Sequence, residues 1–187
     1  MKAVFRRACA LLLTASLAAC ASTGGGGEAR GGADVTTSHL GQQIARSQIS
    51  IEAFDAADAN LPEFQGYAAS VAGQLTRLGW TVVNTAGQSE QVALVDVQQG
   101  SRAGLSGRIN MGTATAAAAG ASAGSVATLL EVRIRRRSDG TVMWEGSAIS
   151  DAPAASASAG RNAAVEGLAA ALFRDFPGAS GRTVRVR

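Results

Sequence analysis

The chain has 187 residues and a formal net charge of +3, with 17 Lys and Arg residues against 14 Asp and Glu residues. Its first three basic residues, Lys2, Arg6 and Arg7, stand in a stretch typical of a removable leader, and without them 14 arginines balance 14 acidic residues. A neutral chain without lysine gives no electrostatic reason to expect a nucleic-acid partner, which argues against nucleic-acid-binding classes.

Residues 1–19 have the layout of a signal peptide for export. A basic start is followed by an apolar run from Ala8 to Leu13 and by small residues that lead to Cys20. The apolar run is much shorter than the roughly 20 residues that a membrane-spanning helix requires. Residues 17–20, Leu-Ala-Ala-Cys, resemble the lipobox of bacterial lipoproteins. That resemblance implies cleavage before Cys20, a diacylglyceryl group on its thiol and acylation of its new amino group.

Cys20 is the only cysteine left after such a cleavage, because Cys9 lies in the leader. No disulfide can then form within the mature chain, so its fold depends on an apolar core. Ala21 and Ser22 follow the cysteine, without an aspartate. Resemblance to the sorting rule of enterobacterial lipoproteins therefore implies the outer membrane, with the domain facing the periplasm. The alternative is an ordinary secreted protein with a coincidental cysteine.

Residues 20–42 are expected to form the lipidated cysteine and a flexible tether. Residues 21–32 are Ser, Thr, Gly and Ala with one Glu and one Arg, a composition that buries little apolar surface and favours disorder. A linker of that length spans roughly 20 Å. The tether should lead into one domain over residues 43–177, and a polar tail should follow over residues 178–187.

The domain is predicted to begin with a strand and a helix. Ile49 and Ile51 alternate with polar residues, which indicates a strand. Asn60, Pro62 and Glu63 then form a capping signal for a helix that ends at Gly79. Five residues recur at helical spacing and are expected to be buried: Phe64, Tyr67, Val71, Leu75 and Leu78.

Three strands and a long loop are predicted next. Residues 80–83 and 92–97 are typical of two strands separated by a turn. From Gly100 to Gly124 all periodicity is lost, so we expect a long mobile loop, with a short helix in its alanine run as the alternative. The next strand is the clearest: Val126, Leu130, Val132 and Ile134 alternate with Glu131, Arg133 and Arg135.

Ser138–Gly140 should turn this strand back into another over residues 141–149. A three-residue loop with a left-handed Gly140 and a G1 bulge keeps the core face apolar, whereas a two-residue turn mixes the faces. The preferred register sets three pairs opposite one another: Ile134 and Trp144, Arg133 and Glu145, Leu130 and Ala148. Each cross-strand pair contributes roughly 0.2 to 1 kcal/mol.

A final helix is expected over residues 158–176, ending at Pro177. Its predicted buried stripe consists of Val165, Leu168, Ala169, Leu172, Phe173 and Phe176. The order strand–helix–strand–strand–loop–strand–strand–helix predicts an α+β fold. In this fold a mostly antiparallel sheet of about five strands carries two helices on one face.

Several of these segments together resemble the bacterial lipoprotein family known as domain of unknown function 4136. Besides the lipobox, the similar segments are Phe54-Asp55, Leu75–Trp80, Ala93–Val97, Asp139–Gly146 and Phe173–Pro177. They span most of the mature chain. The resemblance implies a small α+β domain at the outer membrane and no established activity.

Two motifs suggest catalysis or metal binding and are better explained otherwise. Gly120–Gly124 fits the G-x-S-x-G pattern of serine hydrolases around Ser122, but that motif needs a strand before it, a helix after it and a later histidine. The only histidine is His39, far upstream. Without a second histidine or a free cysteine, His39 is expected to be a solvated side chain and no metal site is predicted.

Three further groups of residues have a structural and a functional interpretation. Asp55 and Asp58 resemble an acid pair for hydrolysis, yet acidic residues also favour a nearby helix start. Arg133, Arg135 and Arg137 form a basic cluster with Arg136, for lipid headgroups or an anionic glycan, but alternation makes it a solvated strand face. Trp144 is a glycan-stacking platform or, opposite Ile134, a core residue, and we expect the core.

The sequence therefore predicts a non-enzymatic, membrane-anchored periplasmic lipoprotein, a binding or assembly-supporting module of the cell envelope. Lipidation at Cys20 is its one predicted site, with no catalytic residue and no cofactor. The expected partners are membrane lipid and an envelope protein or glycan. The alternatives are an envelope hydrolase with a cryptic site at Ser122 or Asp55, and an oligomerising or membrane-inserting component that uses the loop at residues 100–124.

Overall fold

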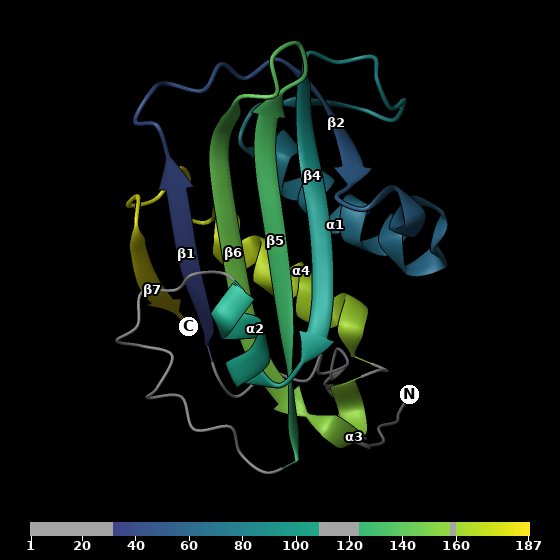
Figure 1. Cartoon of the computed structure of the whole chain (residues 1–187), viewed down its shortest axis with the longest axis vertical. Coiled ribbons are helices and arrows are strands. Elements are labelled where there is room, and N and C mark those ends of the chain that lie inside the picture. Colours follow the sequence, from purple (N-terminus) through teal and green to yellow (C-terminus); the bar gives the residue numbers. More distant parts are fainter. Residues whose placement is uncertain (1–31, 109–123, 158–159) are drawn as a thin grey trace, which may run out of the picture.

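The computed structural model describes residues 32–108, 124–157 and 160–187 (Figure 1). The strands within these residues are β1 (Ala33–His39), β2 (Gln48–Ala53), β3 (Thr81–Val83), β4 (Gln91–Gly100), β5 (Ser125–Arg136), β6 (Val142–Pro153) and β7 (Arg182–Val186). The helices are the 3-10 helix η1 (Ala56–Asn60) and the α-helices α1 (Pro62–Arg77), α2 (Arg102–Arg108), α3 (Ala154–Ala157) and α4 (Arg161–Phe173).

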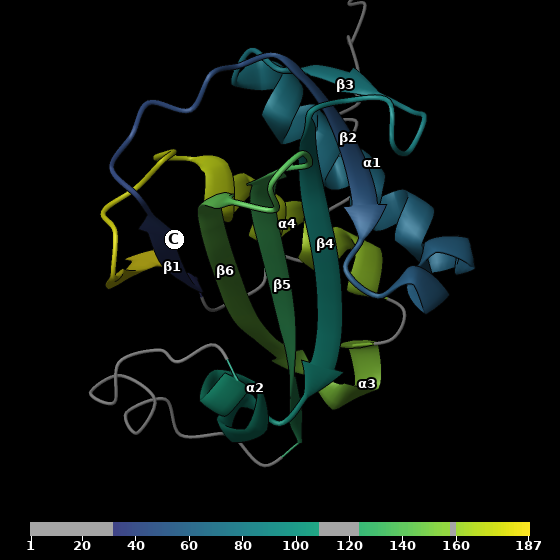
Figure 2. The ribbon, with the colours of Figure 1, turned by 45° about the horizontal axis from the view of Figure 1, so that its top comes forward.

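The seven described strands form one sheet in the order β3-β2-β4-β5-β6-β1-β7. β2 pairs in parallel with β3 and β4, and the other four pairings are antiparallel. α1 and α4 pack together on one face, whereas α2 lies on the opposite face against β4 and β5 (Figures 1 and 2). The predicted α+β class is confirmed. The predicted number of about five strands and two helices is wrong, because the described residues add β1, β7, α2 and α3.

The two strands at one edge of the sheet, β1 and β7, were not predicted as strands. β1 falls in the predicted tether, residues 20–42, and β7 in the predicted polar tail, residues 178–187. β1 pairs with both β6 and β7. The buried apolar residues of these two strands are few, namely Ala33, Val35 and Val186. Their sequences therefore carry little hydrophobic pattern, and their pairing depends on contacts between opposite ends of the chain.

The predicted first helix is confirmed, but its predicted cap is wrong. α1 buries Phe64, Tyr67, Val71 and Leu75 as expected. Its N-cap residue is Leu61, whose side chain makes no capping hydrogen bond, and Asn60 belongs to η1. Asp55 caps η1 instead, because its Oδ1 accepts a hydrogen bond from the backbone N–H of Ala57 at 2.9 Å.

The predicted register of the β5–β6 hairpin is confirmed at all three expected pairs. Ile134 lies opposite Trp144, and both side chains are fully buried. Gly140 has a φ of 72°, the left-handed conformation that the turn was expected to require. The core interpretation of Trp144 is therefore confirmed, and a glycan-stacking platform on this side chain is excluded.

The loop of this hairpin is longer than the three residues predicted, because the backbone N–H of Gly140 donates to the carbonyl oxygen of Arg136 and that of Arg136 donates to the carbonyl oxygen of Thr141. A second irregularity, which was not predicted, lies within the strands. Arg135 pairs with Val142, so Met143 is the extra residue within β6. Arg137 leaves the hairpin, and its backbone N–H donates to the carbonyl oxygen of Glu90 at 2.7 Å. A contact with the segment before β4, which lies far away in the sequence, therefore decides the shape of the turn.

The predicted long loop begins with a helix. Residues 102–108 form α2, and Leu105 packs against Ala127, Leu129 and Ile149 on the sheet. Burial of this one large apolar side chain favours a helix where the sequence shows no helical periodicity. Residues 109–123, including Ser122, lie outside the described residues, as do the signal peptide and Cys20.

α4 confirms the predicted final helix over most of its length. It buries Val165, Leu168, Ala169, Leu172 and Phe173. Phe176, predicted as the last residue of the stripe, lies beyond the helix and packs edge-on against Trp80, with ring centroids 5.4 Å apart. Together with α1 and the facing side of the sheet, these residues form the main core. No helix within residues 32–108, 124–157 and 160–187 combines the length and apolar character required to cross a membrane.

Candidate functional site

The two faces of the sheet differ in how far helices cover them. α1 and α4 cover one face, whereas on the other α2 lies near one end of β4 and β5 (Figures 1 and 2). Beyond α2 this second face carries a hollow of about 330 Å³. We call it the acidic hollow, and its lining residues are Phe54, Asp55, Asp58, Leu94, Asp96, Gln98, Glu131 and Arg133.

Strand alternation places the polar residues of the acidic hollow. In β4, Ala93 and Val95 are buried in the main core, so Leu94, Asp96 and Gln98 lie on the opposite face. Phe54 enters from the end of β2, where its backbone N–H donates to the carbonyl oxygen of Val95 at 2.9 Å. The hollow therefore forms where β2, η1, β4 and β5 meet.

Charges in the acidic hollow are strongly unequal. Four carboxylates line it, from Asp55, Asp58, Asp96 and Glu131, and Arg133 is its one cationic lining residue. Arg133 Nε donates to Glu145 Oε1 at 2.7 Å, so its charge is already balanced. Its guanidinium lies 4.6 Å from the ring centroid of Phe54. The potential of the hollow is therefore negative, beside an aromatic side chain that is 51% exposed.

A polar network lies on the same sheet face beyond the hollow. Arg137 Nη2 contacts both Glu52 and Ser50 Oγ, the latter at 2.9 Å, and its Nε donates to the carbonyl oxygen of Ser89. Burial raises the pKa of the Glu52 carboxyl group, but hydrogen bonds from Arg137 and Ser50 outweigh it, so this pKa lies below its ordinary value. This network fixes the hairpin turn to β2.

The structure brings some predicted candidates together and separates others. Asp55 and Asp58 share the acidic hollow with Asp96 and Glu131, which were not recognised in the sequence. Asp96 alternates with apolar residues in β4, and Glu131 does so in β5. This alternation was the sequence signal that could have placed both on the same face of the sheet. Arg133 and Arg135 lie on this face as predicted, whereas the exposed Arg136 pairs with Asp139 at 2.8 Å.

His39 lies away from the hollow, in β1 rather than beside a tether. The ring is half-buried: Nδ1 accepts from the backbone N–H of Gly41 at 3.0 Å, and Nε2 lies 3.2 Å from the carbonyl oxygen of Gly178. The expectation of a solvated histidine is therefore wrong. Among the residues that the structure describes, no group of three or more His, Cys, Asp and Glu side chains could hold a metal ion.

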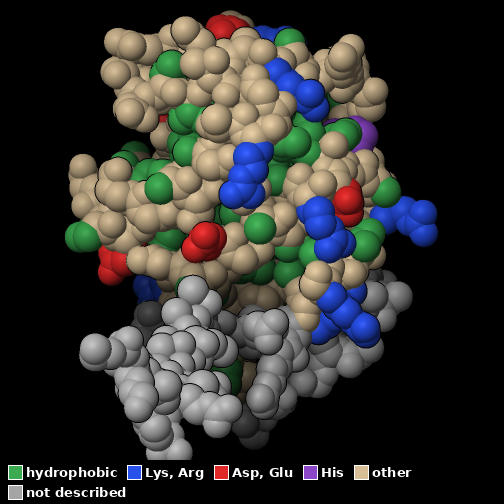
Figure 3. Space-filling model, turned by 180° about the vertical axis from the view of Figure 1, so that it is seen from behind, with side chains coloured by type: hydrophobic (Ala, Val, Ile, Leu, Met, Phe, Trp, Pro, Cys, Tyr) green, Lys and Arg blue, Asp and Glu red, His purple; other side chains and the backbone are tan. Residues whose placement is uncertain are grey.

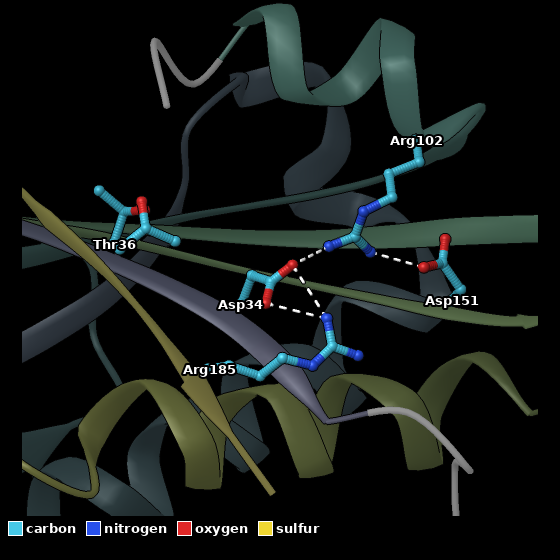
Figure 4. Close-up of polar contacts among 6 residues, drawn as sticks. Asp34, Thr36, Arg102, Asp151 and Arg185 are labelled. Atoms are coloured by element: carbon cyan, nitrogen blue, oxygen red, sulfur yellow. Dashed lines mark hydrogen bonds and ion pairs between the residues drawn. The ribbon is translucent and has the colours of Figure 1, made fainter. Parts of the chain in front are cut away.

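A second polar cluster, also missed in the sequence, fixes α2 to the sheet (Figure 4). Arg102 of α2 is 6% exposed and forms ion pairs with Asp34 of β1 and, at 2.6 Å, with Asp151 of β6. Arg185 of β7 pairs with the same Asp34 at 3.1 Å. The positive charges of two arginines are balanced by the negative charges of two aspartates, which indicates a structural cluster rather than a ligand site.

Comparisons with known proteins show the fold alone. No family model matches the chain. An uncharacterized protein from Zymomonas mobilis subsp. mobilis is 24% identical over 218 aligned residues, which cover 82% of this chain and 80% of that protein. A PDZ domain protein from Parabacteroides distasonis has a TM-score of 0.50 at 13% identity, over 82% of this chain and 39% of that chain. A PelC dodecamer from Paraburkholderia phytofirmans has a TM-score of 0.45 at 14% identity, over 74% of this chain and 92% of that chain.

Proposed function

We propose that this chain is a cell-envelope lipoprotein, held at the outer membrane by acylated Cys20, with its domain in the periplasm. Its domain acts as a non-enzymatic binding or assembly-supporting module, and the acidic hollow is its binding surface. Support for the anchor comes from the order of leader, lipobox and Gly-rich linker in the sequence. The resemblance to the domain of unknown function 4136 lipoproteins supports the same location.

The observation that carries the binding role is the half-exposed Phe54 beside four carboxylates. Exposed aromatic side chains at the centre of a polar rim are typical of protein interaction surfaces. The carboxylates of Asp55, Asp58 and Asp96 in the lining of the hollow favour a partner with positive surface potential and speed its approach. An envelope protein with a basic surface fits this hollow better than an anionic glycan does.

A hydrolase remains the alternative function, with Asp55 or Ser122 as the acting residue. Asp55 has a structural task in this fold, since its carboxylate caps η1. If any hydrolytic activity is found, Asp55→Asn and Ser122→Ala separate the two functions. Loss of that activity in either variant supports the enzyme, and full activity in both supports the binding module.

In-cell crosslinking from the hollow tests the proposed function. A photoreactive amino acid at Gln98, which lines the hollow, should capture one or a few envelope components reproducibly. Phe54→Ser should reduce the yield of that adduct strongly. Leu40→Ser is the matched control, because Leu40 is 63% exposed and does not line the hollow. Absence of any envelope adduct, or an equal loss in both variants, contradicts the proposal.

A further inference from the structure

The outward side of α4, which faces away from the core, carries small apolar residues between exposed polar ones. Its inward side buries Val165, Leu168, Ala169, Leu172 and Phe173. Its outward side exposes Ala163, Gly167 and Ala170 where a surface helix normally carries charged residues.

An apolar groove lies along this outward side of α4. We call it the α4 groove; it holds about 400 Å³ and is bordered across from α4 by Ala33 of β1 and Val186 of β7. Figure 3 views the helix-covered face, where hydrophobic side chains lie between separate basic ones. The groove is therefore a surface that a second apolar element can cover.

We propose that the α4 groove is the dimer interface of this protein, occupied by α4 of a second copy in antiparallel orientation. In a twofold interface every contact occurs twice, because residue i of one copy meets residue j of the other and the reverse. With the twofold axis at Ala170, the residue four positions before Ala170 in one copy faces the residue four positions after it in the other copy. Glu166 of one copy then lies opposite Arg174 of the other, and the reverse pair forms as well.

The charges and side-chain sizes of α4 suit this arrangement. Glu166 and Arg174 are both exposed, and the contacts of Arg174 are long: 3.7 Å to the carboxylate of Asp175 and 3.4 Å to the carbonyl oxygen of Arg187. Gly167 and Ala170 lack bulky side chains, so two helix backbones can approach closely between the paired charges. An apolar centre with self-complementary charges at its rim selects a second copy over an unrelated partner.

The α4 groove is bordered by the start of β1 as well as by β7. Gly32 and Ala33 line the α4 groove, so the start of β1 lies beside the proposed interface in each copy. The dimer itself does not depend on lipidation, since its contacts lie within the described domain.

Glycine substitutions on two helices test the interface. At Gly167 in α4 and at Gly73 in α1, an added Cβ atom meets no other atom within 4 Å, and both glycines are exposed. Gly167→Gln should leave the fold intact and raise the dimer dissociation constant at least about tenfold, because the longer side chain blocks helix contact. Gly73→Gln is the matched control and should dimerise like the wild type. Light scattering of the full-length protein purified in detergent measures both, with circular dichroism as the check on folding.

A charge swap tests the antiparallel pairing. Glu166→Arg and Arg174→Glu should each weaken the dimer at least about tenfold, because each sets like charges opposite one another. The double variant should restore wild-type dimerisation. A monomeric wild type, equal effects of the two glycine variants, or a double variant no better than the singles overturns the proposal.

Discussion

Trp144 is the residue whose burial the sequence pattern predicted most directly. Its ring is fully buried and lies 5.3 Å from the ring of Phe173, and its Nε1–H donates to the carbonyl oxygen of Pro177 at 2.9 Å. Gly146 leaves the space beside the ring, where a Cβ atom would come within 2.3 Å of it. Trp144 therefore connects the sheet to α4 and to the segment after it.

Replacing this ring should destabilise the protein severely. Trp144→Ala removes the ring and leaves a cavity, so we expect a loss of about 3 to 5 kcal/mol in the free energy of unfolding, measured by urea denaturation. In a Trp80→Phe background, iodide should barely quench the fluorescence of Trp144. Efficient quenching in the folded protein would contradict its burial.

The lowered pKa of Glu52 predicts how stability depends on pH. A group whose pKa is lower in the folded than in the unfolded chain stabilises the fold above its unfolded pKa, here about 4.5, and this stabilisation is lost as the pH falls. Wild type should therefore be more stable than Glu52→Gln at pH 6. The difference should shrink as the pH falls from 5 toward 3. Urea midpoints across this range measure it, and a constant difference would refute the assignment.

At the scale of elements, α2 depends on one buried cation. Arg102→Leu leaves Asp151 without this partner, while Asp34 keeps its pair with Arg185. We therefore expect the free energy of unfolding to fall by about 2 to 3 kcal/mol. Arg136→Leu is the control and should cost much less, because its pair with Asp139 is exposed to solvent. Urea denaturation of both variants tests this, and equal losses would show that the buried cluster does not hold α2.

β7 lies in the predicted polar tail, and two of its own valines test its role. Val186 is 7% exposed, so Val186→Asp puts a charge into an apolar site and should cost about 3 kcal/mol or more. Val184 on the same strand is 48% exposed, and Val184→Asp should cost less than about 1 kcal/mol. Thermal unfolding compares the two variants. If both are as stable as the wild type, β7 does not dock as described.

For the whole molecule, the proposed anchor determines where the domain acts. A single acyl chain binds membranes with a partition constant on the order of 10⁴ per molar, and each further buried CH₂ adds about 0.8 kcal/mol. Three chains on Cys20 should make attachment effectively permanent. Wild type should therefore fractionate with outer-membrane markers and resist high salt, whereas Cys20→Ser should stay uncleaved at the inner membrane. Release of wild type by salt, or a free thiol at residue 20 in mass spectrometry, would disprove the anchor.

The sequence by itself determined the α+β class, α1, most of α4 and the register of the β5–β6 hairpin. These features depend on neighbours in the chain: apolar residues at helical spacing bury one face, and the pair of Arg133 and Glu145 favours one register. Tertiary structure alone decided the pairing of β1 with β7, the docking of α2 through Arg102 and the gathering of four carboxylates in the acidic hollow. Each of these joins segments distant in sequence, and their stabilisation exists only after the sheet has formed.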